Sequence, residues 1–495
     1  MYQLFDGYKE MMQPVNYLTK SLCNSSLLNN DKIKNRKSVR HLRASAEMIE
    51  RLTRRYGKPD FGLNSTMIDG QEVPIKEEIV LSKTFCNLVN FKRNNSKNDQ
   101  AILMVAPMAG HYAALTRDTI KQFLPDHDVY VTDWKNVRDI PIEEGEFGFD
   151  DFVEYLVEFL RFMGPGNTLM SACQPCPGAL VAAAVLAMED DPAQPESLIL
   201  MAGPVDPRIN QAKFLKTATD KISPKLLEKL TIDTVPAQYK GRNRRVYAGF
   251  RQLSFFMSMN IPLHLKKHFE FYKNLLKGDE SSAEVHRIFY DNYSAMVDGD
   301  AKFYMDTMER VFQEHHLPKG IMQYKGKTID TGAIKKTALM TVEGEKDQFC
   351  PPGQTEAAHG ICPNIPSEMR EQYLQAGVGH YGVFSGSKFR DIIAPKIKAF
   401  IKKNAAPAKN SKETAEKAKI EAAAAVKKAA APKAAIKKAT APKATIKKAA
   451  APKAEVKEEA TAKTASVLKT AVKEEVTVKT VPAAETAKKD STSKA

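Results

Sequence analysis

Short apolar runs and amphipathic segments alternate through the middle of the chain. Residues 101–107 (AILMVAP), 127–134 (HDVYVTDW) and 197–203 (SLILMAG) are apolar runs of strand length, and residues 149–164 (FDDFVEYLVEFLRFMG) place apolar side chains at helical spacing. An apolar run without polar alternation is typical of a central strand in a parallel sheet. The alternation therefore predicts an α/β fold with a doubly wound, mostly parallel sheet, which binds ligands at the carboxyl ends of its strands.

The pattern differs before this body. One segment carries apolar side chains close to helical spacing, at Leu42, Ala46, Ile49 and Leu52. Residues 67–92 follow it and are rich in the β-branched and aromatic side chains that strands prefer. We expect residues 1–99 to form a helical and strand extension that packs on the body.

The alternation stops between residues 206 and 332, where the chain is helical in pattern and rich in Phe and Tyr, and it resumes afterwards. The α/β core is therefore expected at residues 100–205 and 333–403, with residues 206–332 inserted as a helical cap over the active face. Its aromatic side chains serve either as ordinary core packing or, as a group, as the lining of an apolar cleft.

The last segment, residues 404–495, has a different composition from the rest. From Ala405 onward it holds 21 lysines, 10 acidic residues and no aromatic residue, so its net charge of +11 leaves only +4 of the chain's +15 for the body. A ten-residue Lys-Ala-Pro unit repeats from Val426, and its regularly spaced prolines limit any helix to about two turns. We expect a disordered basic tail.

Three roles remain open for this tail. It can contact DNA nonspecifically, through the lysine-rich residues 409–453, it can attach to an anionic granule surface, or it can be a solvated linker without a partner. Contact with DNA would weaken steeply as salt rises, because it rests on counterion release.

Cysteine usage and hydropathy bear on the compartment. Six cysteines in 495 residues are too few for a disulfide framework, the N-terminus lacks a long apolar leader, and no run approaches the roughly 20 apolar residues that span a bilayer. We expect a cytoplasmic protein with reduced thiols.

The candidate chemistry centres on Cys173, in the segment NTLMSACQPCPGALVAAAVLAM (167–188). A strand-length run ends at this thiol, a turn follows, and a small-residue helix begins, which is the context of a nucleophile elbow. Asp347 and His380 come after later strands, so all three side chains are expected at the carboxyl edge of the sheet. A thiol nucleophile needs a base, and the base needs a group that orients it.

Backbone donors for an oxyanion are also available. The N–H of Gln174 directly follows the candidate nucleophile, and a second N–H can come from Met108 or Ala109 in the loop after residues 101–107. His111 lies in the same loop and is a candidate substrate contact.

Four alternatives compete with this interpretation. Cys173 can be a buried structural cysteine, or it can form a CxxC redox pair with Cys176. Asp133 ends a strand and is an alternative acid, but it precedes the thiol in the chain. Ser171 is a rival nucleophile, although two residues back along the strand it should lie beneath the site.

Several segments, in the same order, resemble the intracellular poly(3-hydroxybutyrate) depolymerases of the cysteine type. They are FCNLVNFKR (85–93), VAPMAGHYAAL (105–115), YVTDWKNVRDIP (130–141), SACQPCPG (171–178), GPVDPRIN (203–210), VEGEKDQFCPPGQT (342–355) and GVGHYGVFSGSKFR (377–390). The resemblance extends to about residue 403.

It implies an α/β-hydrolase fold in which Cys173 is the nucleophile, Asp347 the acid and His380 the base, with no cofactor. The implied substrate is an amorphous polyester granule in the cytoplasm, and either water or a thiol such as coenzyme A accepts the acyl group. The related polyester synthases place their cysteine in a G-x-C-x-G box, so Ser171 and Pro175 here favour the depolymerase. The alternatives are a synthase-like acyltransferase and a protein that tethers polymer to DNA.

The roles of the tail can be separated by deleting residues 405–495. We expect the deletion to leave ester hydrolysis intact and to reduce salt-sensitive retention on a DNA column, because the lysines that release counterions are removed. Retention of the truncated protein at unchanged salt would exclude the tail as the DNA contact.

Overall fold

The computed structural model describes residues 1–94, 99–211, 216 and 222–405. The chain divides into two units, and the first, Met1–Ala430, contains all of these residues. The expected tail, from residue 406 onward, and its DNA-contact segment at residues 409–453 lie outside the described residues.

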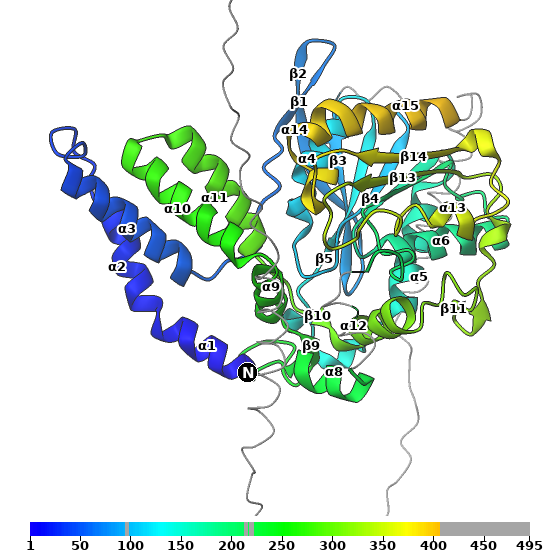
Figure 1. Cartoon of the computed structure of the whole chain (residues 1–495), viewed down its shortest axis with the longest axis horizontal. Helices are drawn as coiled ribbons and strands as arrows, with labels where there is room; N and C mark the ends of the chain where they lie inside the picture. The colour runs from blue at the N-terminus through cyan, green and yellow to red at the C-terminus, as the bar shows by residue number, and fades with distance from the viewer. Residues whose placement is uncertain (95–98, 212–215, 217–221, 406–495) are drawn as a thin grey trace, which may run out of the picture. The chain divides into compact units, whose positions relative to one another are not determined.

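A nine-stranded sheet forms the centre of the first unit (Figure 1). Its order is β1-β2-β3-β5-β4-β6-β7-β13-β14, and every pair from β5 to β14 is parallel, whereas β1, β2 and β3 pair antiparallel. The strands are β1 (Ser65–Ile68), β2 (Gln71–Ser82), β3 (Cys86–Arg93), β4 (Ala101–Val105), β5 (Asp128–Trp134), β6 (Asn167–Ala172), β7 (Ser197–Met201), β13 (Ala338–Gly344) and β14 (Arg370–Gln375). This is the predicted α/β-hydrolase architecture.

Helices cover both faces of this sheet (Figure 1). On one face α4 (Arg117–Phe123) packs against α15 (Ala394–Asn404), and on the other α5 (Phe149–Met163) packs against α6 (Cys176–Met188). α6 is buried on all sides because its residues are small and apolar. A Cβ at its Gly178 would lie 2.4 Å from the Phe152 ring, so glycine allows α5 and α6 to approach closely.

The N-terminal strands belong to the sheet itself and are not an extension packed on it, because β3 pairs with β5. Ahead of them lie α1 (Tyr2–Met11), α2 (Gln13–Cys23) and α3 (Lys37–Thr53). Of the four apolar positions that predicted α3, only Ala46 is buried, and Leu42, Ile49 and Leu52 are exposed. The buried face of α3 is partly charged, because Arg51 pairs with Asp291 of the cap.

The cap segment is inserted between β7 and β13, which are neighbours in the sheet. It contains α8 (Pro224–Thr231), α9 (Gly249–Ser258), α10 (Ile261–Lys277), α11 (Glu280–Ser294) and α12 (Ala301–Thr307). It also contains strands that the expected helical pattern did not include: β8 (Ile232–Thr234), β9 (Arg245–Tyr247) and β10 (Gly299–Asp300) form one small sheet, and β11 (Gln323–Tyr324) pairs with β12 (Lys327–Thr328). The boundaries 206 and 332 stay a prediction.

The helices α13 (Ala358–Ile361) and α14 (Gly386–Lys388) are short and lie in the loops around β14. Within the described ranges, none of the helices is both long enough and apolar enough to cross a membrane.

Candidate active site

Cys173 lies in the sharp turn between β6 and α6. Its φ of 66° is in the left-handed region, which costs a non-glycine residue about 1–2 kcal/mol. The N–H of Cys173 donates to the Met201 carbonyl at 2.8 Å, and its carbonyl accepts from the N–H of Cys176 at 3.1 Å. Opposite this turn a Cβ at Gly203 would lie 2.3 Å from the Cys176 Cβ, so glycine lets the turn approach β7. The turn leaves the Cys173 side chain partly exposed at the carboxyl edge of the sheet.

Asp347 and His380 form a buried pair at the same edge. The His380 Nδ1 and the Asp347 Oδ2 lie 2.8 Å apart, and the other carboxylate oxygen accepts from the N–H groups of Phe349 and Cys350 at 2.8 and 3.0 Å. Asp347 follows β13, and His380 begins the short 3₁₀ helix η7 (His380–Val383) after β14. The hydrogen bond orients the imidazole so that its Nε2 is free to face another group.

The fully buried carboxylate of Glu343, at the end of β13, stabilises the loop that carries this aspartate. It accepts hydrogen bonds from the N–H groups of Gly353, Thr355 and Glu356, at distances between 2.7 and 3.1 Å. Sequence reasoning did not identify this residue. The signal was a lone acidic side chain within an otherwise apolar strand-length run, ALMTVEG.

Cys173 completes the group because its sulfur lies close enough to His380 to act on the imidazole electrostatically. Burial acts to lower the pKa of His380, but the carboxylate of Asp347 and the Cys173 sulfur both raise it, and the pKa is well above its ordinary value. The three side chains that the sequence proposed as a group therefore lie together, with the imidazole of His380 beside the Cys173 sulfur.

One candidate oxyanion donor, the N–H of Gln174, directly follows the thiol in the chain. The other candidates, the N–H groups of Met108 and Ala109, lie in the loop after β4. In the described part of the chain, the N–H groups of Gln174, Met108 and Ala109 have no hydrogen-bond partner. Gly110 has a φ of 90°, and a Cβ there would meet the Gln252 side chain at 2.5 Å, so this loop packs directly against α9 of the cap. The Gln174 side chain points toward α12, with its Nε2 3.5 Å from the Thr307 hydroxyl.

Five aromatic and imidazole rings, including that of His380, contact one another in a closed circuit. The centroid distances are 5.5 Å from His111 to Phe256, 5.6 Å from Phe256 to Phe349, 5.0 Å from Phe349 to His380, 5.6 Å from His380 to Tyr381 and 6.4 Å from Tyr381 back to His111. Phe256 belongs to α9, His380 and Tyr381 belong to η7, and His111 and Phe349 lie in loops of the core. Sequence reasoning did not single out Phe349 or Tyr381, although each lies within two residues of a triad candidate.

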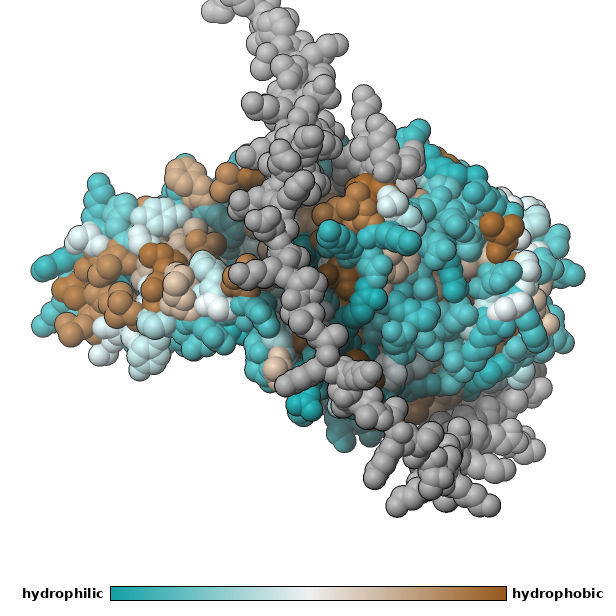
Figure 2. Space-filling model, turned by 90° about the horizontal axis from the view of Figure 1, so that it is seen from below, coloured by the Kyte–Doolittle hydropathy of each residue, from teal (hydrophilic) through white to brown (hydrophobic). Residues whose placement is uncertain are grey.

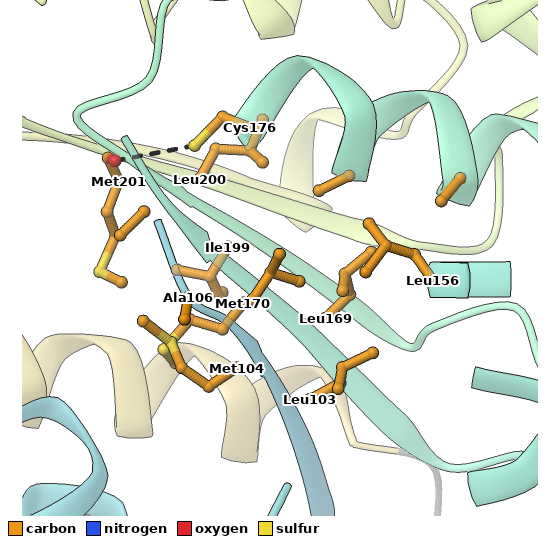
Figure 3. Close-up of a cluster of buried hydrophobic side chains, with 14 of the residues drawn as sticks. Leu103, Met104, Ala106, Leu156, Leu169, Met170, Cys176, Ile199, Leu200 and Met201 are labelled. Carbon is orange, nitrogen blue, oxygen red and sulfur yellow. Dashed lines mark hydrogen bonds between the residues drawn. The ribbon is translucent and has the colours of Figure 1, made fainter. Parts of the chain in front are cut away.

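The rival candidates lie elsewhere. Cys176 points into the core, where its Sγ donates to the carbonyls of Ser171 and Met201, and burial raises its pKa to about 12 (Figure 3). Ser171 is fully buried within β6. Asp133 is paired with Lys58. All six cysteines are free thiols, and the described ranges contain no cluster of three His, Cys, Asp or Glu side chains that could hold a metal ion.

The sheet order, the left-handed elbow and the Asp347–His380 pair define an α/β hydrolase. A family model described as "PHB de-polymerase C-terminus" matches residues 202–405, which include both members of that pair, and this match supports a carboxylic ester hydrolase of the PHB depolymerase type. No curated protein matches the sequence significantly.

Similar solved structures include a soluble variant of monoglyceride lipase from Saccharomyces cerevisiae, 13% identical, with a TM-score of 0.43, covering 69% of this chain and 98% of that one. Another is a thermophilic esterase from Thermogutta terrifontis, 13% identical, with a TM-score of 0.37, covering 69% of this chain and 98% of that one. Because both TM-scores are below 0.5, these similarities carry no argument, and the fold assignment rests on the strand order of the sheet and on the elbow at Cys173.

Thiol alkylation tests the electrostatics of this site. Burial raises the pKa of each of the other five thiols, so we expect iodoacetamide at pH 7 to modify Cys173 at least about tenfold faster than any other cysteine. Peptide mapping by mass spectrometry measures the rates. His380→Gln should slow the reaction at Cys173, and Cys23, which is also partly exposed, is the internal control. Equal rates at Cys23 and Cys173 would contradict an activated thiol.

Proposed function

We propose that this protein hydrolyses the ester bonds of a 3-hydroxybutyrate polyester held in amorphous granules, with Cys173 as its nucleophile. The observation that carries the proposal is the thiol at a left-handed elbow, beside a histidine whose Nδ1 is hydrogen-bonded to a buried carboxylate. The match of residues 202–405 to the PHB depolymerase family model supports the choice of polyester.

In the first half of the reaction the Cys173 thiolate attacks the ester carbonyl carbon and forms a carbon–sulfur bond. The negative charge that develops on the carbonyl oxygen is stabilised by the N–H of Gln174 and by that of Met108 or Ala109. The carbon–oxygen ester bond then breaks, and the leaving alkoxide takes the proton of His380. The products are an acyl thioester on Cys173 and a polymer fragment with a free hydroxyl.

In the second half, His380 takes a proton from water, and the hydroxide attacks the thioester. The tetrahedral intermediate uses the same N–H donors, and its collapse releases a carboxylic acid and the thiolate. Asp347 holds the imidazole in one tautomer and orientation throughout, so His380 acts as acid and then as base. Overall, one ester and one water become one acid and one alcohol.

The N-terminal helices supply a surface suited to an insoluble apolar substrate. Along α1 and α2, apolar side chains recur every three or four residues on one exposed face and are between 38% and 76% exposed: Leu4, Tyr8, Met11, Val15 and Leu18. The opposite face of α1 packs on the cap, where Phe5 stacks on Phe250 at 4.5 Å. Figure 2 shows apolar side chains gathered on the part of the molecule that these helices form. We name the five residues the apolar stripe and propose that it adsorbs to the granule.

Loss of the nucleophile tests the reaction. We expect Cys173→Ala to lower the release of 3-hydroxybutyrate from amorphous granules about 10³-fold or more, because a triad loses its covalent step with its nucleophile. Cys176→Ser is the matched control, because it removes a thiol three residues from Cys173. This variant should retain turnover, since a serine hydroxyl can donate to the same buried carbonyls. Undiminished release by Cys173→Ala would refute the proposal. Chromatography of the products with coenzyme A present identifies the acceptor, since water gives the free acid and a thiol gives a new thioester.

A second variant tests the apolar stripe. We expect Leu4→Glu combined with Leu18→Glu to weaken cosedimentation with granules about tenfold, and to lower turnover on granules relative to turnover of a soluble ester, because two exposed leucines that adsorption would bury are replaced by charges. Gln3→Glu combined with Gln13→Glu adds the same charge at exposed positions beside the stripe. Equal binding by the two double variants would show that the stripe does not contact the polymer, and a change of oligomeric state in the first alone would assign the stripe to a second copy of the chain.

A further inference from the structure

One face of α11 exposes apolar side chains along a line that ends at the candidate active site. Within the cap, α11 packs against the short helix Ala113–Thr116 of the core (Figure 1). Val285, Phe289 and Tyr293 are spaced four residues apart, so they lie on one side of the helix and span about 12 Å of its axis. Their exposed fractions fall in this order, from 69% to 40% to 2%. Ile288 is 46% exposed and widens the same face, and we name Val285, Ile288 and Phe289 the apolar track.

Ring contacts connect the inner end of the apolar track to the triad. Phe289 stacks on Tyr293 with the ring centroids 5.4 Å apart, and it meets Tyr381 edge-on at 6.3 Å. Tyr381 in turn contacts His380 at 5.6 Å, and His380 lies beside the Cys173 sulfur. Tyr381 and Cys173 are both partly exposed, so the track leads to parts of the site that a substrate can reach.

Helix α9 places a second exposed ring near the same histidine. Phe255 is 41% exposed and contacts Phe256 at 5.8 Å. Phe256 contacts Phe349 at 5.6 Å, and the Phe349 ring lies 5.0 Å from that of His380. A single exposed phenylalanine needs no explanation, but exposed rings on two cap helices that both lead to one histidine of the triad indicate a binding surface.

The charged side chains of α11 lie on a different face of the helix. Arg287 pairs with Glu47 of α3, and Asp291, four residues further along, pairs with Arg51 of α3. The track residues themselves carry no charge. Such a surface suits an uncharged substrate whose repeating unit carries a methyl group, whereas a phosphate-bearing partner, such as a nucleic acid or an anionic lipid, would need cations there.

We propose that the apolar track binds the polyester segment next to the scissile ester and guides it to Cys173. This inference rests on the proposed function. The track differs in its task from the apolar stripe, because the stripe adsorbs the protein to the granule and the track holds a single polymer chain. Contact with the track removes apolar area of the chain from water, so it favours a substrate of several units over an ester of one unit.

A soluble oligomer tests the track without the adsorption step. We expect Phe289→Ser to lower kcat/KM for the methyl ester of the 3-hydroxybutyrate trimer about tenfold, mainly through a higher KM, because the oligomer loses a contact that it makes in the ground state and the transition state alike. The same variant should leave kcat/KM for p-nitrophenyl acetate nearly unchanged, since an acetyl group does not extend along α11. Phe289→Leu keeps an apolar side chain and should retain most of the activity on the trimer.

The matched control is Phe269→Ser. Phe269 lies on α10, is 59% exposed, and its ring contacts the Lys273 ammonium. This variant should cleave the trimer as fast as the wild-type protein does, because Phe269 is outside the track. An equal loss of trimer cleavage in Phe269→Ser and Phe289→Ser would contradict a specific track on α11.

The remaining outcomes separate the track from the reaction. Unchanged trimer cleavage by Phe289→Ser, or an equal loss on both esters, would overturn the track and leave the hydrolase proposal standing. If size-exclusion chromatography showed a wild-type dimer that dissociates in Phe289→Ser while trimer cleavage stays unchanged, the face would belong to a second copy of the chain and the track would be overturned. Failure of the wild-type protein to cleave either ester, with no difference from Cys173→Ala, would refute the hydrolase proposal itself.

Discussion

The left-handed backbone at Cys173 is the constraint on which the rest of the site depends. A φ of 66° at a residue with a side chain is unfavourable, and the surrounding structure must compensate for it. The compensation is local: the N–H of Cys173 bonds the Met201 carbonyl, and Gly203 leaves space for the turn. Because β6 and β7 are neighbouring central strands, the sheet itself holds the thiol at its carboxyl edge. The buried Cys176 belongs to this support, since its Sγ bonds two strand carbonyls.

The insertion of the cap between adjacent strands explains how core and cap share one site. β7 and β13 pair in parallel, so the inserted segment leaves the sheet at the carboxyl end of β7, beside the elbow, and returns at the amino end of β13, at the opposite edge of the sheet. Its contacts with the site are largely aromatic, with Phe256 touching Phe349 and Tyr293 touching Tyr381. Ring contacts combine a large apolar area with few obligatory hydrogen bonds. Polar contacts also cross, and the N–H of Val297 donates to the Gly110 carbonyl in the loop after β4 at 2.6 Å.

The sequence predicted the parts of this structure that depend on local pattern. The apolar runs located the central strands, and the order of Cys173, Asp347 and His380 placed three side chains at one edge, since parallel strands end together. It did not predict that β3 joins the sheet, because pairing of β3 with β5 is decided by contacts distant in sequence. The helix over Lys37–Thr53 formed as expected, but Leu42 and Leu52 are exposed, because the face toward the cap is filled by alanines and ion pairs. Glu343 was missed because a carboxylate in a buried strand acquires its role only from the loop that folds over it.

Two imidazoles within one circuit of rings are driven to opposite protonation states, and the difference follows from their partners. Burial opposes a charge on both rings. His380 faces a carboxylate and a thiol, and their negative charge outweighs the burial, so the ring holds a proton that it can deliver to a leaving alkoxide. At His111 the backbone of Tyr293 acts to raise the pKa, but burial and the charge of His380 lower it by more, so the pKa falls to about 4. The protonated ring thus depends on the neutral one remaining neutral, because a charged His111 would weaken the hold of His380 on its proton.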